Sequence, residues 1–257
     1  MPASLLLDDL AAFAPHAVAV TGDLVNFALP AEFIAARDIL HRIGPPGRVS
    51  VIPGNHDALV PVPWAQGIGQ WAEWMRDDDA GEGFPFVHRR GPAALVGLST
   101  AIPTPPGWAA GRLGAAQLGL LGQRLAALRE EGLFRVVLIH HPPCGENRRR
   151  GLRDRAALLD VLAREGAELL LHGHSHRPGL VPLPGPGGSP VPAIGVPPAL
   201  AGAGRHHLSR WHLHRVTPSA GGWWLETLVR GYDPQAQRFA TLGEWRLRVA
   251  APVSTAV

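Results

Sequence analysis

The stretch Val49-Ser50-Val51-Ile52-Pro53-Gly54-Asn55-His56-Asp57 joins a short apolar run to a cluster of polar side chains. The run Val49–Ile52 is typical of a buried strand, so Gly54–Asp57 falls at the carboxyl end of that strand. In α/β proteins, ligands bind at the edge of the sheet where the carboxyl ends of the strands meet. The sequence therefore predicts that Gly54–Asp57 lies at a functional edge of a sheet.

Three further polar clusters follow apolar runs in the same way. Thr21-Gly22-Asp23 follows Ala17–Val20, His140–Pro143 follows Val136–Ile139, and His172–His176 follows Leu169–Leu171. Each cluster alone is weak evidence, because single Asp residues often cap turns and single His residues often end strands. Together, an Asp, an Asn and several His residues at one sheet edge predict a hydrolytic metal centre.

The rest of the chain alternates helix-like and strand-like segments, which predicts an α/β fold. Helical spacing of apolar residues predicts helices over Leu5–Phe13, Ala31–Ile43, Ala115–Glu131 and Arg153–Gly166, with a weaker one over Trp64–Arg76. Further strands are predicted over Ala93–Leu98, Val191–Val196, His207–Val216 and Trp223–Val229. The Pro- and Gly-rich segment Pro178–Pro190 is predicted to be a loop. We expect one domain over residues 1–257, with its core at about residues 17–229.

The composition narrows the class of protein. The 46% hydrophobic content is typical of a soluble globular protein, and the net charge of +3 is too small to indicate a nucleic-acid partner. No run reaches the roughly 18 apolar residues of a membrane span, and Met1–Leu10 lacks the pattern of a secretory signal. Cys144 is the only cysteine, which fits a reducing compartment. We expect a cytoplasmic protein without a membrane partner, and the oligomeric state stays open.

The donor atoms of the clusters indicate which metal is expected. Asp23 offers a carboxylate oxygen, Asn55 an amide oxygen, and three residues offer imidazole nitrogens, namely His140, His174 and His176. Mixed oxygen and nitrogen ligation suits Mn, Fe or Zn, whereas Ca prefers oxygen alone. His174 and His176 are two residues apart, so in an extended segment they point to the same side.

These motifs, in this order, resemble the calcineurin-like metallophosphoesterase superfamily, in the broad group that includes bacterial cyclic-nucleotide phosphodiesterases. The resemblance implies a four-layer α/β/β/α sandwich with two metal ions at one sheet edge. Asp23 would bridge the ions, Asn55, His140 and His174 would bind the second ion, and His176 the first. The implied reaction is attack on phosphorus by a hydroxide that the metal ions activate.

The resemblance also implies roles for the other two polar residues of the opening stretch. His56 would contact the phosphate and protonate the leaving oxygen, and Asp57 would orient the His56 imidazole. His141 and His172 are expected to lie outside the ligand set. A serine or cysteine nucleophile has no support, because Ser99 and Ser175 lack the Gly-x-Ser-x-Gly motif.

One motif of the superfamily is absent from this sequence. The superfamily pattern opens with Asp-x-His at the end of its first strand, and here no Asp is followed by His two residues later. We therefore expect the first strand and its two ligands to be missing. The first metal would keep only Asp23 and His176, whereas open catalytic sites usually have three protein ligands. This predicts one firmly held ion, a second site that is weak or empty, and impaired activity.

Several residues have competing interpretations. The segment Arg148–Arg155 either binds a substrate phosphate or is a solvated entrance to a helix. Trp108 is a possible stacking surface at the site, and Asn26 either lines the pocket or ends a turn. His212 and His214 are expected to be solvated strand histidines, and the tryptophans of Trp64–Arg76 to cap the core.

Three functions remain open at this point. The first is a metal-dependent phosphodiesterase that acts on a small phosphodiester. The second is a nuclease of the same superfamily, for which the chain lacks an extended basic track with aromatic side chains. The third is a degenerate metallophosphoesterase that serves as a binding scaffold, which the missing Asp-x-His motif favours.

Overall fold

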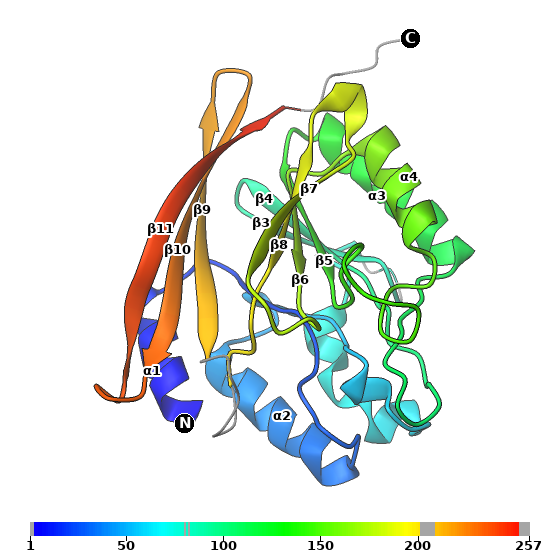
Figure 1. The fold of residues 1–257 in the computed structure, drawn as a ribbon, viewed down its shortest axis with the longest axis vertical. Helices are drawn as coiled ribbons and strands as arrows, with labels where there is room; N and C mark the ends of the chain where they lie inside the picture. The colour runs from blue at the N-terminus through cyan, green and yellow to red at the C-terminus, as the bar shows by residue number, and fades with distance from the viewer. Residues whose placement is uncertain (1–2, 80, 82, 201–208, 252–257) are drawn as a thin grey trace.

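A six-stranded mixed sheet forms the centre of the protein in the computed structural model, which describes residues 3–200 and 209–251 except residues 80 and 82 (Figure 1). The strand order is β3-β4-β5-β6-β8-β7. The strands are β3 (Phe86–Arg90), β4 (Ala93–Gly97), β5 (Phe134–Ile139), β6 (Leu169–His172), β7 (Gly179–Leu183) and β8 (Val191–Gly195). The four inner strands run parallel, and the two edge strands run antiparallel to their neighbours.

Two helices, α3 (Ala115–Glu130) and α4 (Arg155–Glu165), cover one face of this sheet (Figure 1). The Leu residues of α3 that recur at helical spacing are buried against apolar side chains of β4, β5 and β6. Asp154 directly precedes α4, and its carboxylate accepts the backbone N–H groups of Leu113 and Gly114 just before α3. This carboxylate therefore connects the beginnings of the two helices.

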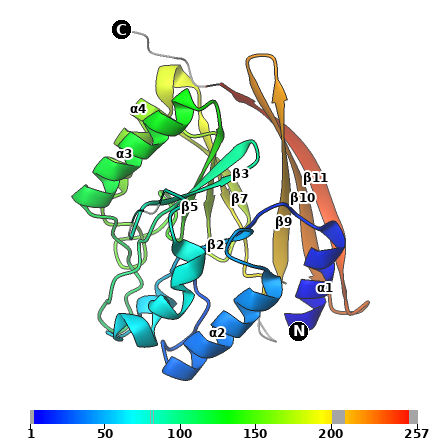
Figure 2. The same cartoon turned by 180° about the vertical axis from the view of Figure 1, so that it is seen from behind.

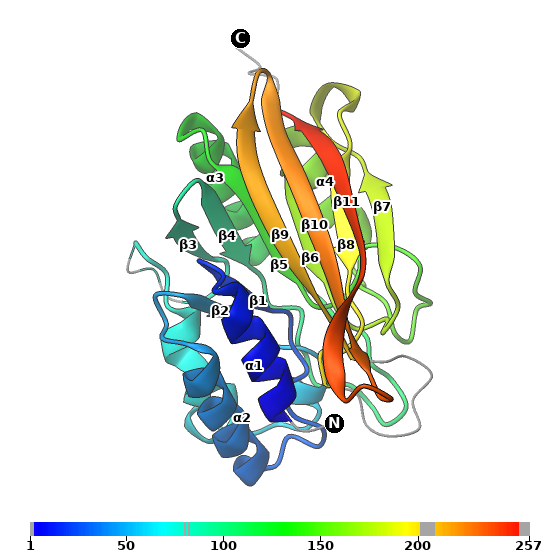
Figure 3. The same cartoon turned by 90° about the vertical axis from the view of Figure 1, so that its left-hand side faces the viewer.

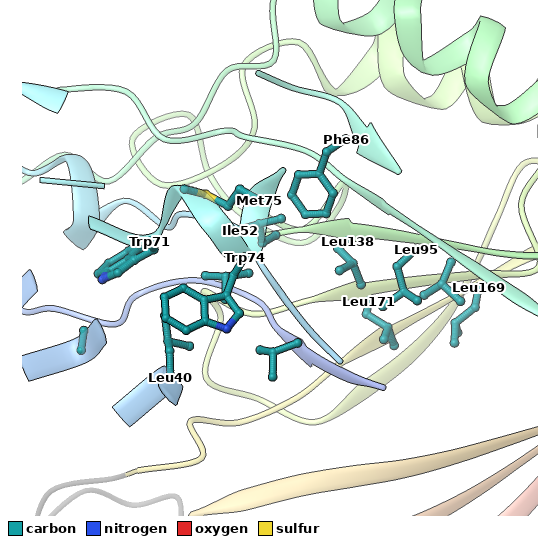
Figure 4. Close-up of a cluster of buried hydrophobic side chains, with 14 of the residues drawn as sticks. Leu40, Ile52, Trp71, Trp74, Met75, Phe86, Leu95, Leu138, Leu169 and Leu171 are labelled. Carbon is teal, nitrogen blue, oxygen red and sulfur yellow. The ribbon is translucent and has the colours of Figure 1, made fainter. Parts of the chain in front are cut away.

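The other face of the sheet packs into a second apolar cluster, shown in Figure 4. This cluster receives side chains from α2 (Pro30–Ile43), from the parallel strands β1 (Val18–Val20) and β2 (Val49–Val51), and from a 3₁₀ helix, η3 (Ile68–Met75). Trp71 and Trp74 are fully buried there, which confirms that they belong to the core, whereas Trp64 is 56% exposed. Figure 2 shows α2 beside β2 from the opposite side of the molecule.

A separate three-stranded antiparallel sheet completes the fold (Figure 3). It consists of β9 (Arg210–Ser219), β10 (Gly222–Asp233) and β11 (Arg238–Ala250). The first helix, α1 (Ala3–Phe13), is attached to it by Asp9, which receives hydrogen bonds from Trp211 and Arg230. Val216, Leu225 and Val249 of this sheet enter the same apolar cluster as β1 and β2.

Most predicted elements are confirmed, but several were wrong or missed. The segment Pro178–Pro190 is not all loop, because it contains β7 and a short 3₁₀ helix, η4 (Pro186–Gly188). Proline is tolerated in β7 because this strand lies at the edge of the sheet. The sequence also missed β3 and β11. The first residues of the predicted strand His207–Val216 lie outside the described residues, and the remainder belongs to β9.

The segment Trp64–Arg76 is not one α-helix. It forms η2 (Trp64–Gln66) and η3, separated by Gly67, whose backbone angles are not helical. The next glycine, Gly69, packs against Trp64, and a Cβ atom there would lie 2.4 Å from the Trp64 carbonyl oxygen. Gly67 and Gly69 therefore allow two short 3₁₀ helices in place of the predicted α-helix.

Two further findings concern the edges and surfaces of the fold. Among the described residues, β1 is hydrogen-bonded to a single neighbouring strand, β2, and its three residues are only partly buried. In the same part of the chain, no helix has both the length and the apolar character that crossing a bilayer requires.

Candidate metal centre

The polar clusters predicted from the sequence lie together at strand ends. Asp23 follows β1, Asn55 follows β2, His140 directly follows β5, and His174 follows β6. One ligand atom from each of Asp23, His140 and His174 lies within 4.8 Å of the others. The parallel pairing of β1 with β2 and of β5 with β6 carries these side chains to shared edges.

The distances within this cluster are close to those of a coordination shell. His140 Nε2 lies 3.2 Å from Asp23 Oδ2 and 3.1 Å from Asn55 Oδ1. His174 Nδ1 lies 2.8 Å from the same Asn55 oxygen. Ligands about 2.1 Å from a tetrahedral ion lie roughly 3.4 Å from one another. The four side chains are thus as close together as one bound cation would require.

The glycines next to the cluster allow this approach. Gly22 has a φ of +94°, in the left-handed region that favours glycine. A Cβ atom on Gly54 would lie 2.2 Å from Asp23 Oδ1 and 2.7 Å from His140 Cε1. Any larger residue at position 54 would therefore push two of the candidate ligands apart.

Hydrogen bonds and charge determine the protonation of the cluster. His140 Nδ1 donates to the Thr21 carbonyl oxygen at 2.7 Å, so its Nε2 faces Asp23 and Asn55. Burial by itself lowers the pKa of His140, but the hydrogen bond to Asp23 and its charge raise it above the ordinary value. Burial raises the pKa of Asp23, yet His140 outweighs this and brings it to about 2. In the charged form of His140, the proton on Nε2 therefore points toward the Asp23 and Asn55 oxygens. A bound cation would take the place of this proton.

The His174 ring is in the protonation state that metal binding requires. Its Nδ1 atom, 2.8 Å from Asn55 Oδ1, faces the other candidate ligands. Burial and the nearby His140 lower the pKa of His174 to about 4, so the imidazole is neutral at pH 7. A neutral imidazole is the form in which His binds metals. The residues present therefore fit a divalent cation.

His176, the fifth predicted ligand, lies in the same pocket but outside the compact cluster. The pocket has a volume of about 280 Å³ and is lined by Asp23, Asn55, His56, His174 and His176, among others. Among the described residues, one group of His, Cys or acidic side chains is close enough together to hold a cation. It consists of Asp23, His140 and His174 and does not include His176. The structure thus brings together Asp23, Asn55, His140 and His174 most closely.

Asp57 was predicted to orient the His56 imidazole, but its carboxylate has other partners. Both of its oxygens accept backbone N–H groups, from Asp23, Leu24, Val25 and Gly54, at 2.7–3.1 Å. Burial raises the pKa of Asp57 to about 6, although these donors stabilise the carboxylate. Asp57 therefore joins the two loops that carry Asp23 and Asn55.

The His56 ring has a different partner. Its Nδ1 donates to the carbonyl oxygen of Asn26 at 2.8 Å, and its backbone N–H donates to Asp23 Oδ1 at 2.9 Å. Asn26 thus contributes through its backbone, and the sequence had considered only its side chain. A backbone carbonyl has no residue preference, so no sequence signal could have identified this contact.

The other histidines have structural partners. His141 Nε2 donates to the Ala109 carbonyl oxygen at 3.0 Å, and its Nδ1 contacts Thr100 Oγ1 at 2.6 Å. Burial lowers the pKa of His141 to about 3. His172 is buried at the end of β6, with Nδ1 3.2 Å from the Gly173 carbonyl oxygen. These positions agree with the expectation that both lie outside the ligand set.

The prediction that His212 and His214 are solvated was wrong. His212, His214 and Val216 occupy every second position of β9, so their side chains share one face of the sheet. Val216 packs against the core, which makes this the inner face. His214 Nδ1 contacts Thr227 Oγ1 at 2.9 Å, and both ring nitrogens of His212 are buried. Burial lowers the pKa of His214 to about 3 and that of His212 to about 4.

Asp23 and Asn55 at the carboxyl ends of the β1–β2 pair, together with His140 and His174 at the ends of β5 and β6, form the arrangement expected of a metal-dependent hydrolase. The model of the calcineurin-like phosphoesterase family matches residues 3–178, more than half of the chain, so the protein belongs to this family. Members of the family are metal-dependent phosphoester hydrolases, and the candidate metal site is consistent with this class.

One of the similar solved structures supports this fold. A dimetal phosphatase from Danio rerio is similar with a TM-score of 0.58 and 14% sequence identity, over 97% of this chain and 89% of that one. At that identity the likeness shows the fold alone. The calcineurin-like phosphoesterase YfkN from Bacillus subtilis aligns with a TM-score of 0.38 and 10% identity, over 96% of this chain and 82% of that one. No curated protein matches the chain in sequence.

Proposed function

We propose that this protein is a metal-dependent phosphodiesterase that hydrolyses small phosphodiesters. The observation that carries the proposal is the convergence of Asp23, Asn55, His140 and His174 at the strand ends, where ligand atoms of Asp23, His140 and His174 lie within 4.8 Å of one another. The pocket above this cluster measures about 280 Å³, at the lower end of the range for small-molecule sites of roughly 300–1,000 Å³. Its size favours a small ester over a polymer.

Asp23, Asn55, His140 and His174 would hold one divalent cation, for which we propose Mn, Fe or Zn. His176 lines the same pocket and would contribute to a second, weaker site. Bound cations supply Lewis-acid chemistry: they neutralise charge on the phosphoryl oxygens and acidify water. The hydrogen bond from His140 Nδ1 to the Thr21 carbonyl fixes the ring so that Nε2 faces the site.

His56 is the proposed proton donor. Its Nδ1 is occupied by the Asn26 carbonyl, and the residue lines the pocket, so Nε2 is the ring atom left to meet the substrate. In the imidazolium form, Nε2–H donates to a phosphoryl oxygen and gives its proton to the leaving oxygen. Asp57 acts as a positioning residue, because its four backbone hydrogen bonds hold the loops of Asp23 and Asn55 together.

Hydrolysis of bis(p-nitrophenyl) phosphate with added Mn²⁺ tests the proposal. We expect turnover of this diester to exceed turnover of p-nitrophenyl phosphate, the matching monoester. His56→Ala should lower kcat by about 10²–10⁴-fold, the range of general acid catalysis, and leave the metal content unchanged. His16→Ala is the matched control, because His16 is exposed and lies outside the pocket. Full turnover in His56→Ala would refute the role of His56.

A binding scaffold without activity is the second candidate. The position of His176 outside the compact cluster favours it. A scaffold would bind metal and phosphoesters but would hydrolyse neither the diester nor the monoester at any Mn²⁺ concentration. The same assay, combined with a metal count by mass spectrometry, therefore separates the two functions.

A further inference from the structure

Two loops supply Gly107, Trp108, Ala109 and Arg150 to the lining of the pocket and are called the rim here. Residues 103–111 follow β4, and residues 145–153 follow β5. Backbone hydrogen bonds join them, from Ala109 N–H to the Arg149 carbonyl at 2.8 Å and from Arg153 N–H to the Gly111 carbonyl at 2.9 Å. The rim contributes none of the candidate metal ligands and no proposed proton donor. The proposed reaction therefore gives no role to Trp108 and Arg150, the two large side chains of the rim that line the pocket.

The backbone of Trp108 is held by hydrogen bonds within its loop. Its N–H donates to the Pro105 carbonyl at 3.0 Å, and its carbonyl accepts from Thr104 Oγ1 at 2.8 Å. The guanidinium carbon of Arg149 lies 5.8 Å from the Trp108 ring centroid. A loop whose backbone is already held loses less conformational entropy when a ligand stacks on its side chain.

His141 attaches this loop to the metal centre. It directly follows His140, and its ring is bonded to Ala109 and Thr100, on the two sides of the rim loop. Gly111 packs directly on the His141 ring, where a Cβ atom would lie 2.3 Å from Nδ1. The position of Trp108 is thereby fixed relative to the metal ligands.

Arg150 places a positive charge at the mouth of the pocket. It is exposed, and its Nε lies 3.9 Å from a Glu146 carboxylate oxygen, which is long for an ion pair. Arg150 lines the pocket together with His174 and His176, so its guanidinium can meet an anionic ligand there.

We propose that Trp108 and Arg150 form a recognition subsite for a nucleoside phosphoester. The base stacks on the Trp108 indole, and the Arg150 guanidinium binds an oxygen of the phosphate. The assignment rests on the proposed function and deepens it by naming the class of substrate. A flat base suits the face of an indole, and Leu59 adds an apolar wall to the same pocket.

The geometry favours a single nucleoside over a nucleic-acid strand. Strand-binding grooves stack successive bases on several aromatic side chains along a basic track. Here Trp108 is the one Trp, Tyr or Phe among the described residues that line the pocket. One indole beside one arginine matches a ligand with one base and one phosphate group near the cation site.

Isothermal titration calorimetry of the Mn²⁺-loaded protein tests this subsite without requiring turnover. The two probes are adenosine 5′-monophosphate and ribose 5-phosphate, which share the phosphate and the sugar and differ in the base. We expect the nucleotide to bind at least about tenfold more tightly, since stacking of one base is worth roughly 1–3 kcal/mol and tenfold corresponds to about 1.4 kcal/mol.

Variants of the two residues give different expected results. Trp108→Ala should bring the affinity ratio of the two probes close to one, and Trp108→Phe should keep part of the preference. Arg150→Ala should weaken both probes by a similar factor, about tenfold, and leave their ratio unchanged. Trp224→Ala and Arg148→Ala are the matched controls, because both residues lie outside the pocket lining, and they should change neither affinity.

Several outcomes would overturn the subsite. Equal affinity of the unaltered protein for the two probes would do so, as would a preference for the nucleotide that survives in Trp108→Ala. The outcome of this binding test is independent of the outcome of the hydrolysis test of the proposed function. A protein that prefers the nucleotide but hydrolyses no ester keeps the subsite and loses the phosphodiesterase. A protein that hydrolyses bis(p-nitrophenyl) phosphate and binds both probes equally keeps the enzyme and loses the subsite.

Discussion

Removal of the Glu168 carboxylate should strongly destabilise the sheet that carries the candidate metal centre. Arg135 at the start of β5 and Glu168 just before β6 are buried, with side chains 1% and 2% exposed. Arg135 Nε and Nη2 donate to the two Glu168 oxygens at 2.9 and 2.8 Å, and Arg135 N–H donates to Oε2 at 2.6 Å. Glu168→Ala removes these three hydrogen bonds and leaves a buried guanidinium without its counter-ion.

Loss of one partner from a buried ion pair costs about 3–5 kcal/mol. For a chain of this size, each kcal/mol lowers Tm by roughly 2–4 °C, so Tm should fall on the order of 10 °C. Two hydrogen bonds remain, from Arg135 Nη1 to the carbonyls of Leu125 and Glu165, and they limit the loss. Urea denaturation followed by tryptophan fluorescence measures the free energy of unfolding, and the eight tryptophans give a strong signal.

Two further variants make this test decisive. Glu130→Ala breaks an exposed ion pair with Arg129 and should cost less than about 1 kcal/mol. The double variant Arg135→Met with Glu168→Met should recover part of the lost stability, because it removes both buried charges. A cost below about 1 kcal/mol for Glu168→Ala, with an unchanged denaturant slope, would show that water solvates the guanidinium and would refute the reasoning.

Four further predictions concern the candidate metal centre. Gly54→Ala should lower metal content and activity by at least about tenfold, because its Cβ would lie 2.2 Å from Asp23 Oδ1; unchanged metal content would contradict this. His174→Ala should release the cation, measured by mass spectrometry, while His16→Ala should retain it. Asp57→Asn should lower the free energy of unfolding by about 1–3 kcal/mol, since an amide cannot accept all four N–H groups; equal denaturation midpoints would refute it. Chelation with EDTA should lower Tm of the unaltered protein by about 5–11 °C, since a ligand at 100 times its Kd contributes about 2.7 kcal/mol; an identical Tm would contradict a bound ion.

Local patterns in the sequence were enough to predict most of the strands and helices near the site. The runs before Asp23, Asn55, His140 and His174 are strands, and their polar residues converge as expected. Buried parallel strands are short, continuous apolar runs, and this pattern depends only on neighbouring residues. The alternation in β11 is also visible in the sequence, in the segment Glu244–Val249, and could have identified that strand.

By itself, then, the sequence determined the fold class, the order of the strands that carry the ligands, and the types of donor atom. The tertiary structure alone decided that Asp57 bonds to backbone N–H groups, that His56 bonds to the Asn26 carbonyl, and that Trp108 and Arg150 line one pocket. The physical reason is the range of the interactions. Periodicity and turn preference act between neighbours in the chain, whereas these contacts join loops that meet only after the strands have packed into a common core.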